Sequence, residues 1–260
     1  MDLGKLIRKS MDENEMIKLF IEACNNKELG HKIVNILLEK KLNINQIIYG
    51  YTIPLPKSSL IMHALIMGHN NIFDLLYDNN ADLNLPSENG ATPLMVCMNI
   101  KRIDFMVKLL NKGVKIDNKT IKTEQNALHI GAEYGFLEGV KLLLEKGADI
   151  DNKTKDGSTA FYLSVKNNHP KIVKLLLEKG ADIDNKTKDG FTALHIAVRD
   201  NRLDIVKLLL EKGAGIENKT KDGFTALHIA VTNNHPKMAK LLLETGSGID
   251  NKTTDGFTAL

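Results

Sequence analysis

The chain has 260 residues, of which 43% are hydrophobic and 26% charged, a balance typical of folded globular proteins rather than disordered ones. With 35 Lys and Arg against 32 Asp and Glu, its net charge of +3 is too small to indicate nucleic acid or an anionic membrane as a partner. The two cysteines, Cys24 and Cys97, lie far apart, which excludes a disulfide framework and a four-cysteine zinc site.

The sequence contains no pattern of a secretory signal or a membrane span. Lys5, Arg8 and Lys9 are followed by acidic residues instead of an apolar core, and no run of about 18 apolar residues occurs. We therefore expect a cytoplasmic protein without a membrane partner. For a chain from an intracellular pathogen or a virus, delivery into a host cell is the alternative.

Residues 1–57 are predicted to form a helical N-terminal cap or a degenerate repeat. The apolar spacing indicates helices over residues 15–23 and 31–40, and the following Leu-Asn-Ile-Asn resembles the loop of the later repeats. An unrelated N-terminal module is the alternative. Residues 53–56, Ile-Pro-Leu-Pro, are expected to be a stiff extended connector, because residues before proline avoid the helical region.

From residue 58 onward the sequence repeats itself with a period of 33 residues. The segment that begins DGFTALHIAV at Asp189 recurs at Asp222, and its frame extends back to Asp156 and forward to Asp255. Earlier copies are more diverged, and one is 34 residues long. The predicted copies cover residues 58–85, 89–118, 123–152, 156–185, 189–218 and 222–251, with a partial copy at 255–260.

Each copy carries signals for two helices and a loop. A threonine such as Thr192 is placed to cap a short helix, whose buried stripe we assign to Leu194, Ile196 and Ala197. A second helix begins at proline in some copies and ends at Gly180 or its counterparts, where a left-handed backbone stops it. Residues 183–190 are expected to form an extended hairpin that leads to the next copy.

Two helices of this size cannot bury an apolar face alone, so the copies must stack into a solenoid. The copies resemble ankyrin repeats, whose pattern is Gly-x-Thr-Pro-Leu-His, then Leu-Leu-Leu, then Gly-Ala-Asp. Pro93 keeps the proline, alanine replaces it in later copies, and Tyr162 replaces the histidine in one copy. The fold class implied is an all-α ankyrin-repeat solenoid, built from helix-turn-helix units and β-hairpin loops.

The histidines and carboxylates of the array do not indicate catalysis or metal binding. His129, His195 and His228 are spread by the repeat, and stacked helices lie roughly 8–10 Å apart, so their rings cannot meet at one ion. The family resemblance implies that this histidine bonds the neighbouring threonine and the hairpin backbone. No motif of a nucleophile elbow, phosphate loop or zinc protease is present. We expect no cofactor, no metal and no enzymatic activity, with an enzyme site in residues 1–57 as the alternative.

The family resemblance also implies that partners bind a concave face lined by the hairpin tips and the short helices. Phe191, Phe224 and Phe257 recur there and are predicted to form an exposed aromatic ladder, suited to protein binding. The alternatives are that the rings pack on the next hairpin, and that the diverged copies between residues 58 and 147 form the binding surface. The candidate partner-binding residues are Lys155, Asp156, Lys188, Asp189, Phe191, Arg199, Lys221, Asp222, Phe224 and Phe257.

A file of lysines also follows the period, at Lys153, Lys186, Lys219 and Lys252. Such a file could follow a row of phosphates, since each neutralised phosphate adds affinity for nucleic acid. An acidic residue stands two positions before each lysine, so we expect the file to be neutralised from within. Nucleic acid is therefore not the expected partner.

The function predicted from these observations is a non-enzymatic scaffold that binds a protein partner. The alternative is an adaptor or secreted effector fragment that recruits a client for an activity outside this chain. The last copy stops inside its short helix, so we also expect weak self-association and fraying at an uncapped C-terminal end.

Overall fold

The computed structural model describes residues 9–26, 29–48 and 57–259. They form two compact units, Met1–Lys122 and Thr123–Leu260, hereafter the N-terminal and the C-terminal unit. The boundary between the two units falls within the predicted array. The connector predicted at residues 53–56 lies outside the described residues.

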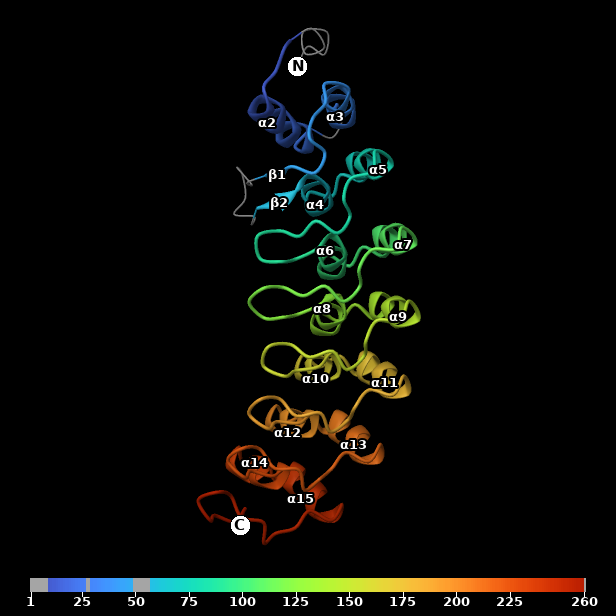
Figure 1. Cartoon of the computed structure of the whole chain (residues 1–260). Helices are drawn as coiled ribbons and strands as arrows, with labels where there is room; N and C mark the ends of the chain where they lie inside the picture. Colours follow the sequence, from blue (N-terminus) through green and yellow to red (C-terminus); the bar gives the residue numbers. More distant parts are fainter. Residues whose placement is uncertain (1–8, 27–28, 49–56, 260) are drawn as a thin grey trace. The chain divides into compact units, whose positions relative to one another are not determined.

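The N-terminal unit consists of successive helix pairs (Figure 1). The first pair matches the two helices predicted within residues 1–57, and its second helix, α3, packs on α5 of the next pair. A short antiparallel strand pair sets Ile47 opposite Ser59. The elements are α2 (Glu13–Cys24), α3 (Gly30–Glu39), β1 (Ile47–Ile48), β2 (Ser58–Ser59), α4 (Leu60–Ile66), α5 (Asn70–Asp78), α6 (Pro93–Asn99) and α7 (Ile103–Asn111).

The C-terminal unit repeats one module, a short helix followed by a nine-residue helix and a loop (Figure 1). Its loops turn back tightly at their tips, where the Gly190 N–H donates to the Thr187 carbonyl at 2.9 Å, and its described residues contain no strand. The helices are α8 (Ala127–Tyr134), α9 (Leu137–Glu145), α10 (Ala160–Lys166), α11 (Pro170–Glu178), α12 (Ala193–Arg199), α13 (Leu203–Glu211), α14 (Ala226–Thr232) and α15 (Pro236–Glu244).

The helix ends lie where the sequence places capping residues. Thr192 precedes α12 with extended backbone, and its hydroxyl accepts the backbone N–H of His195 at 3.5 Å. Pro170 is the first residue of α11, where its missing N–H costs no hydrogen bond. Gly180 has a φ of 88° after that helix, and Asn80, with a φ of 61°, takes the equivalent place after α5.

The apolar stripes of neighbouring copies form the core of the C-terminal unit. Short helices pack on short helices, α8 on α10, α10 on α12 and α12 on α14, and α9 lies against α11. The predicted stripe of Leu194, Ile196 and Ala197 is at most 1% exposed. Burying a large apolar side chain contributes about 1.5–3 kcal/mol, so the copies stabilise one another through these stripes.

Backbone hydrogen bonds also connect the loop tips of the C-terminal unit. The N–H of Lys188 donates to the Asp156 carbonyl at 2.8 Å, and the N–H of Lys221 donates to the Asp189 carbonyl at 3.0 Å. Gly190 lies under this second bond, and a Cβ added to it would be 2.7 Å from the Lys221 nitrogen. We call this series of bonds between successive loop tips the tip ladder. A residue with a side chain does not fit at Gly190, next to one of its bonds.

We expect Gly190→Ala to destabilise the protein more than Gly213→Ala. Both glycines have a positive φ, 81° and 84°, so both substitutions carry a left-handed penalty of about 1–2 kcal/mol. Only at Gly190 would the new methyl group also strike the next loop, whereas no atom lies within 4 Å of a Cβ at Gly213. Urea denaturation of both variants measures the difference, and equal losses of unfolding free energy would contradict a close-packed tip ladder.

Candidate interaction surface

Buried histidines join each short helix to the following loop in the C-terminal unit. His195 is 1% exposed, and its Nε2 donates to the Asn218 carbonyl at 2.9 Å. Its Nδ1 accepts the backbone N–H of Thr192 at 3.0 Å. His129 makes the same Nε2 contact with the Asn152 carbonyl at 2.9 Å. The hydrogen-bonding role that the resemblance implied for these histidines is confirmed.

This arrangement keeps His195 neutral over most of the pH range. Burial in the core lowers its pKa to about 4, because the imidazolium loses its hydration there. A histidine in an unfolded chain has a pKa of about 6.5. The folded state therefore binds fewer protons than the unfolded state between these two values.

We expect the protein to lose stability as the pH falls from about 6.5 to about 4. Neutral His195 stabilises the fold fully above pH 6.5, the pKa of histidine in an unfolded chain. The free energy of unfolding should fall by about 3 kcal/mol as the pH decreases from there to about 4. Urea denaturation at pH 7.5 and 4.5 should show a smaller pH dependence in His195→Gln than in the wild type, whereas His31→Gln, at an exposed position, should keep the wild-type dependence. An unchanged pH dependence in His195→Gln would contradict the assignment.

Tyr162 breaks this series of histidine links in the copy at residues 156–185. Its side chain is 8% exposed, and within the described residues its hydroxyl makes no hydrogen bond. Burial raises the pKa of Tyr162 to about 12, so the phenol stays protonated at neutral pH. The carboxamide of Asn185 instead donates to the Gly157 carbonyl at 3.1 Å, while its buried Oδ1 has no partner.

We expect Tyr162→His to raise the free energy of unfolding and His195→Tyr to lower it. The first change supplies the missing link to the Asn185 carbonyl, and the second removes an existing one. A net hydrogen bond contributes about 1 kcal/mol. Urea denaturation measures both changes, and a loss of stability in both variants would show that the link has no value of its own.

The predicted charged residues at the tips lie on the surface of the C-terminal unit. The exposed ones are Lys155, Asp156, Lys188, Asp189, Lys221 and Asp222. Burial raises the pKa of Asp156, but hydrogen bonds from Thr154 and Ser158, the latter at 3.0 Å, lower it below its ordinary value. Asp189 has Phe191 in place of that serine, and its carboxylate makes no hydrogen bond within the described residues.

The prediction of an exposed aromatic ladder is wrong for Phe191 and Phe224. Both rings are half-buried, and each lies in a T-shaped arrangement with the histidine of its own copy, with centroid distances of 5.9 Å to His195 and 5.8 Å to His228. Phe257 is 69% exposed. The first two rings therefore shield the histidine links, and the ladder does not form a row of free aromatic anchors.

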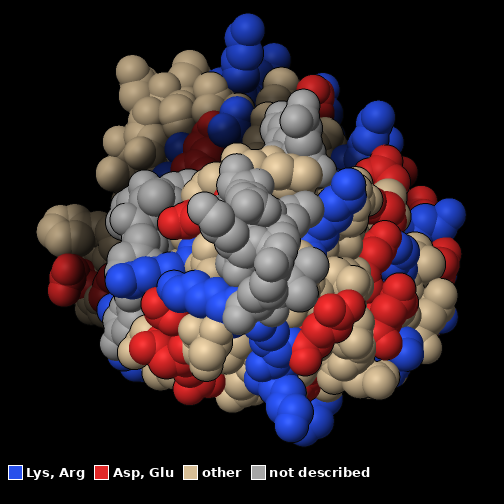
Figure 2. All heavy atoms as spheres, turned by 90° about the horizontal axis from the view of Figure 1, so that it is seen from above, with Lys and Arg blue, Asp and Glu red and all other residues tan. Residues whose placement is uncertain are grey.

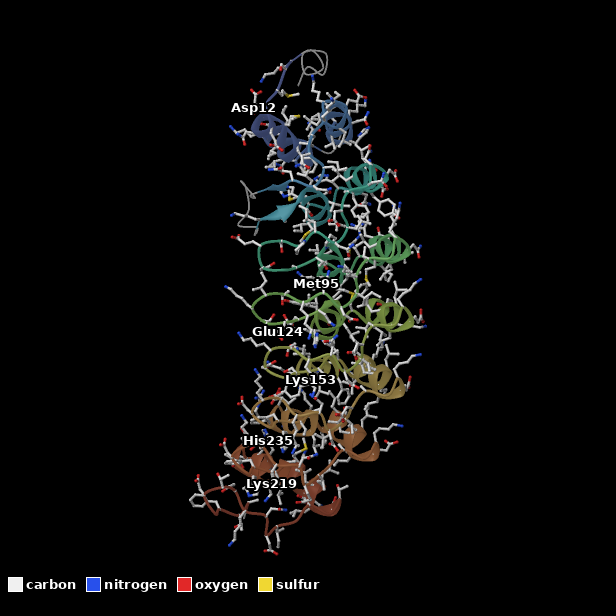
Figure 3. The ribbon with its side chains drawn as sticks, viewed as in Figure 1. Asp12, Met95, Glu124, Lys153, Lys219 and His235 are labelled. Carbon is white, nitrogen blue, oxygen red and sulfur yellow. The ribbon has the colours of Figure 1, made fainter. Side chains whose placement is uncertain are left out.

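Arg199 and two turn histidines complete the surface beside the short helices. Arg199 is exposed at the end of α12, and its Nε lies 2.9 Å from the Asp200 carboxylate. His235 (labelled in Figure 3) bonds the Arg199 carbonyl at 3.1 Å, and His169 bonds the Glu133 carbonyl at 2.9 Å. Sequence reasoning missed these last two bonds, although the recurring His-Pro pair was their visible signal.

The lysines and the acidic residues of the file make contacts different from the mutual pairing that the sequence predicted. Lys186 and Lys219 (the latter labelled in Figure 3) donate to the backbone carbonyls one copy further on, at 3.2 and 3.0 Å. The acidic residues that precede them do not pair with them in the described part of the chain. Asp184 and Glu217 instead accept backbone N–H groups of the next copy, at 2.9 and 2.8 Å. Basic and acidic side chains are interspersed over the face seen in Figure 2.

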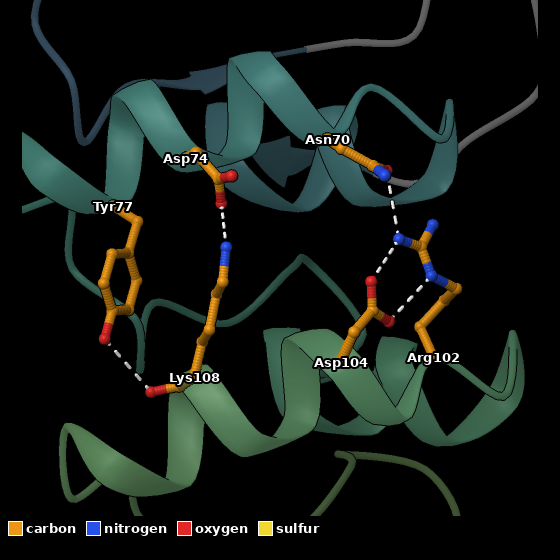
Figure 4. A network of polar contacts seen from close by, with 6 residues as sticks. All are labelled: Asn70, Asp74, Tyr77, Arg102, Asp104 and Lys108. Carbon is orange, nitrogen blue, oxygen red and sulfur yellow. Dashed lines mark hydrogen bonds and ion pairs between the residues drawn. The ribbon is translucent and has the colours of Figure 1, made fainter.

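The diverged copies of the N-terminal unit carry their own polar network between α5 and α7 (Figure 4). Arg102 binds Asp104 at 2.6 Å and Asn70 at 3.0 Å, and Lys108 binds Asp74 at 2.5 Å. Two of these contacts cross between the helices. Arg102 and Asn70 are 32 residues apart along the chain, and Lys108 and Asp74 are 34 residues apart. The network therefore joins consecutive copies, and sequence reasoning did not identify it.

Comparison with known proteins supports the repeat assignment along most of the chain. A family model described as ankyrin repeats (3 copies) matches residues 19–120, 60–154, 101–187, 128–222 and 183–255. None of the helices in the described residues is long and apolar enough to cross a membrane.

Several larger proteins resemble part of the chain. The nematode Caenorhabditis elegans homolog of transient receptor potential cation channel subfamily A member 1 is 29% identical over 115 residues, 44% of this chain and 9% of its own length. Mouse inversin is 34% identical over 97 residues, 37% of this chain and 9% of inversin. Rat ankyrin repeat and SAM domain-containing protein 6 is 32% identical over 111 residues, 42% of this chain and 12% of that protein. The matches thus span about a tenth of these relatives. Because the family model covers well over half of the sequence, the chain belongs to the ankyrin-repeat family.

Proposed function

We propose that the chain is a non-enzymatic, cytoplasmic scaffold that binds a protein partner through the loop tips and short helices of the C-terminal unit. Ankyrin repeats are generally protein-interaction modules, and the family is typically non-enzymatic. In this proposal residues 1–57 cap the array that begins at residue 58, and neither a cofactor nor nucleic acid takes part.

The observation that supports this surface best is the tip ladder. The hydrogen bonds from Lys188 to Asp156 and from Lys221 to Asp189 fix successive tips at one spacing, while their charged side chains stay exposed. A surface that is ordered before binding loses little conformational entropy on association. The tips therefore present alternating charges in a fixed register, which favours a protein partner with a complementary charge pattern.

We expect Lys188→Glu combined with Lys221→Glu to release the partner. The measurement is capture from native cytosol on the immobilised full chain, with mass spectrometry of the retained proteins. Reversing two charges at the centre of an interface should leave less than about a tenth of the partner bound, since a loss of about 1.4 kcal/mol is tenfold.

The matched control reverses the same charges on the nine-residue helices. Lys174 and Lys207 are exposed on α11 and α13, so Lys174→Glu with Lys207→Glu changes the net charge equally but leaves the tips intact. Retention by this control supports the tip surface. Release by the control alone would place the binding surface on the nine-residue helices, and retention by both variants would place it in the N-terminal unit.

A further inference from the structure

The loops that follow α5 and α7 enclose a cavity of about 380 Å³ within the N-terminal unit. We propose that this cavity accepts the carboxylate of an acidic side chain that stands next to an apolar side chain in the protein partner. The inference goes beyond the proposed function and rests on it only in taking the partner to be a protein. The cavity is hereafter the loop cavity, and its lining includes Asn84, Lys115, Asn118, Lys119 and Ile121.

The loop cavity keeps the backbone geometry of the repeat but changes the sign of its charge. The Asn84 carboxamide oxygen accepts the backbone N–H of Lys115 at 2.8 Å. In the C-terminal unit the same bond joins the Asp151 carboxylate to the backbone N–H of Asp182, at 3.0 Å. An amide and an ammonium group therefore stand at the loop cavity where the later junction has two carboxylates.

The polar groups of the loop cavity are mainly hydrogen-bond donors. Lys115 is exposed and forms no ion pair with any described residue. The Asn84 oxygen is engaged by the backbone, so its amino group is the part left to donate. Lys119 adds a second positive charge, and none of the lining residues carries a carboxylate. A carboxylate, which only accepts hydrogen bonds, can satisfy these donors together, whereas a cationic side chain would be repelled.

Ile121 gives the loop cavity an apolar rim. Its backbone N–H donates to the Asn89 carbonyl at 2.9 Å, and the counterpart in the C-terminal unit is the bond from Lys188 to Asp156. Ile121 thus takes the place of a tip lysine with an apolar side chain that is 69% exposed. Contact with this side chain removes apolar surface from water, which favours a peptide with an apolar neighbour over a free anion.

The test uses the ¹⁵N-labelled full chain and the peptide acetyl-Gly-Leu-Glu-Leu-Gly-amide, followed through the amide chemical shifts of the protein. We expect saturable shifts at Gly90, Lys115 and Ile121. The peptide with glutamine in place of glutamate should bind at least about tenfold more weakly, because it has lost the charged acceptor.

Two variants change the loop cavity without removing its backbone bond. Lys115→Asp and Asn84→Asp introduce the residue that the later junction carries at Asp182 and Asp151, so both should fold. Each places a repelling charge at the loop cavity and should weaken binding of the glutamate peptide at least about tenfold. Chemical shifts elsewhere in the chain report whether each variant keeps the fold.

The matched control is Lys101→Asp, which makes the same change of charge in the turn between α6 and α7. Lys101 is exposed, does not line the loop cavity and has a φ of 57°, a left-handed conformation that aspartate adopts more readily than most residues. This variant should bind the glutamate peptide within about twofold of the wild type.

Three results would overturn the inference: equal binding of the glutamine peptide, equal effects of Lys115→Asp and Lys101→Asp, or the same shifts from sodium phosphate at the same concentration. The last result would assign the loop cavity to a free anion instead of a partner side chain. Capture of the partner by Lys188→Glu with Lys221→Glu reads the C-terminal unit without this peptide, so failure of the loop cavity is distinguishable from failure of the proposed function.

Discussion

The hydrogen bond from a buried histidine to the loop that leads to the next copy is the constraint on which the C-terminal unit depends. A helix pair of this length cannot bury its apolar face alone, so each copy must hold the next at one distance. His195 does so from a site that is 1% exposed, where the neutral imidazole satisfies both the cap of its own helix and the carbonyl of Asn218. Burial lowers the pKa of His195 to about 4, because the charged ring would have no hydration in that site.

Two further ladders reinforce the same spacing on the surface. Tip N–H groups donate to carbonyls of the preceding tip, and the carboxylates of Asp184 and Glu217 accept N–H groups from the following loop. Such surface carboxylates would ordinarily be assigned to ion pairs with the nearby lysines. Their use as acceptors for the backbone explains why an acidic residue recurs at that position, since an unpaired N–H in a loop between stacked copies is costly.

A regular array gives every copy nearly the same environment, so specific chemistry requires a departure from the repeat. Tyr162 is such a departure, because its copy lacks the histidine link and the hydroxyl of this buried residue makes no hydrogen bond within the described residues. In the same copy the Oδ1 of Asn185 is buried without a partner.

The sequence by itself determined the helices, their caps and the period of the array. Thr192, Pro170 and Gly180 act through their own backbone and their nearest neighbours, so their roles are readable from local pattern alone. Only the tertiary structure decided which side chains remain free on the surface. Asp184 accepts a backbone N–H of the next copy, and Arg102 reaches Asn70, which lies 32 residues earlier. Each of these contacts joins side chains to groups in another part of the fold, and the choice between solvent and such a partner depends on distances that exist only once the copies have stacked.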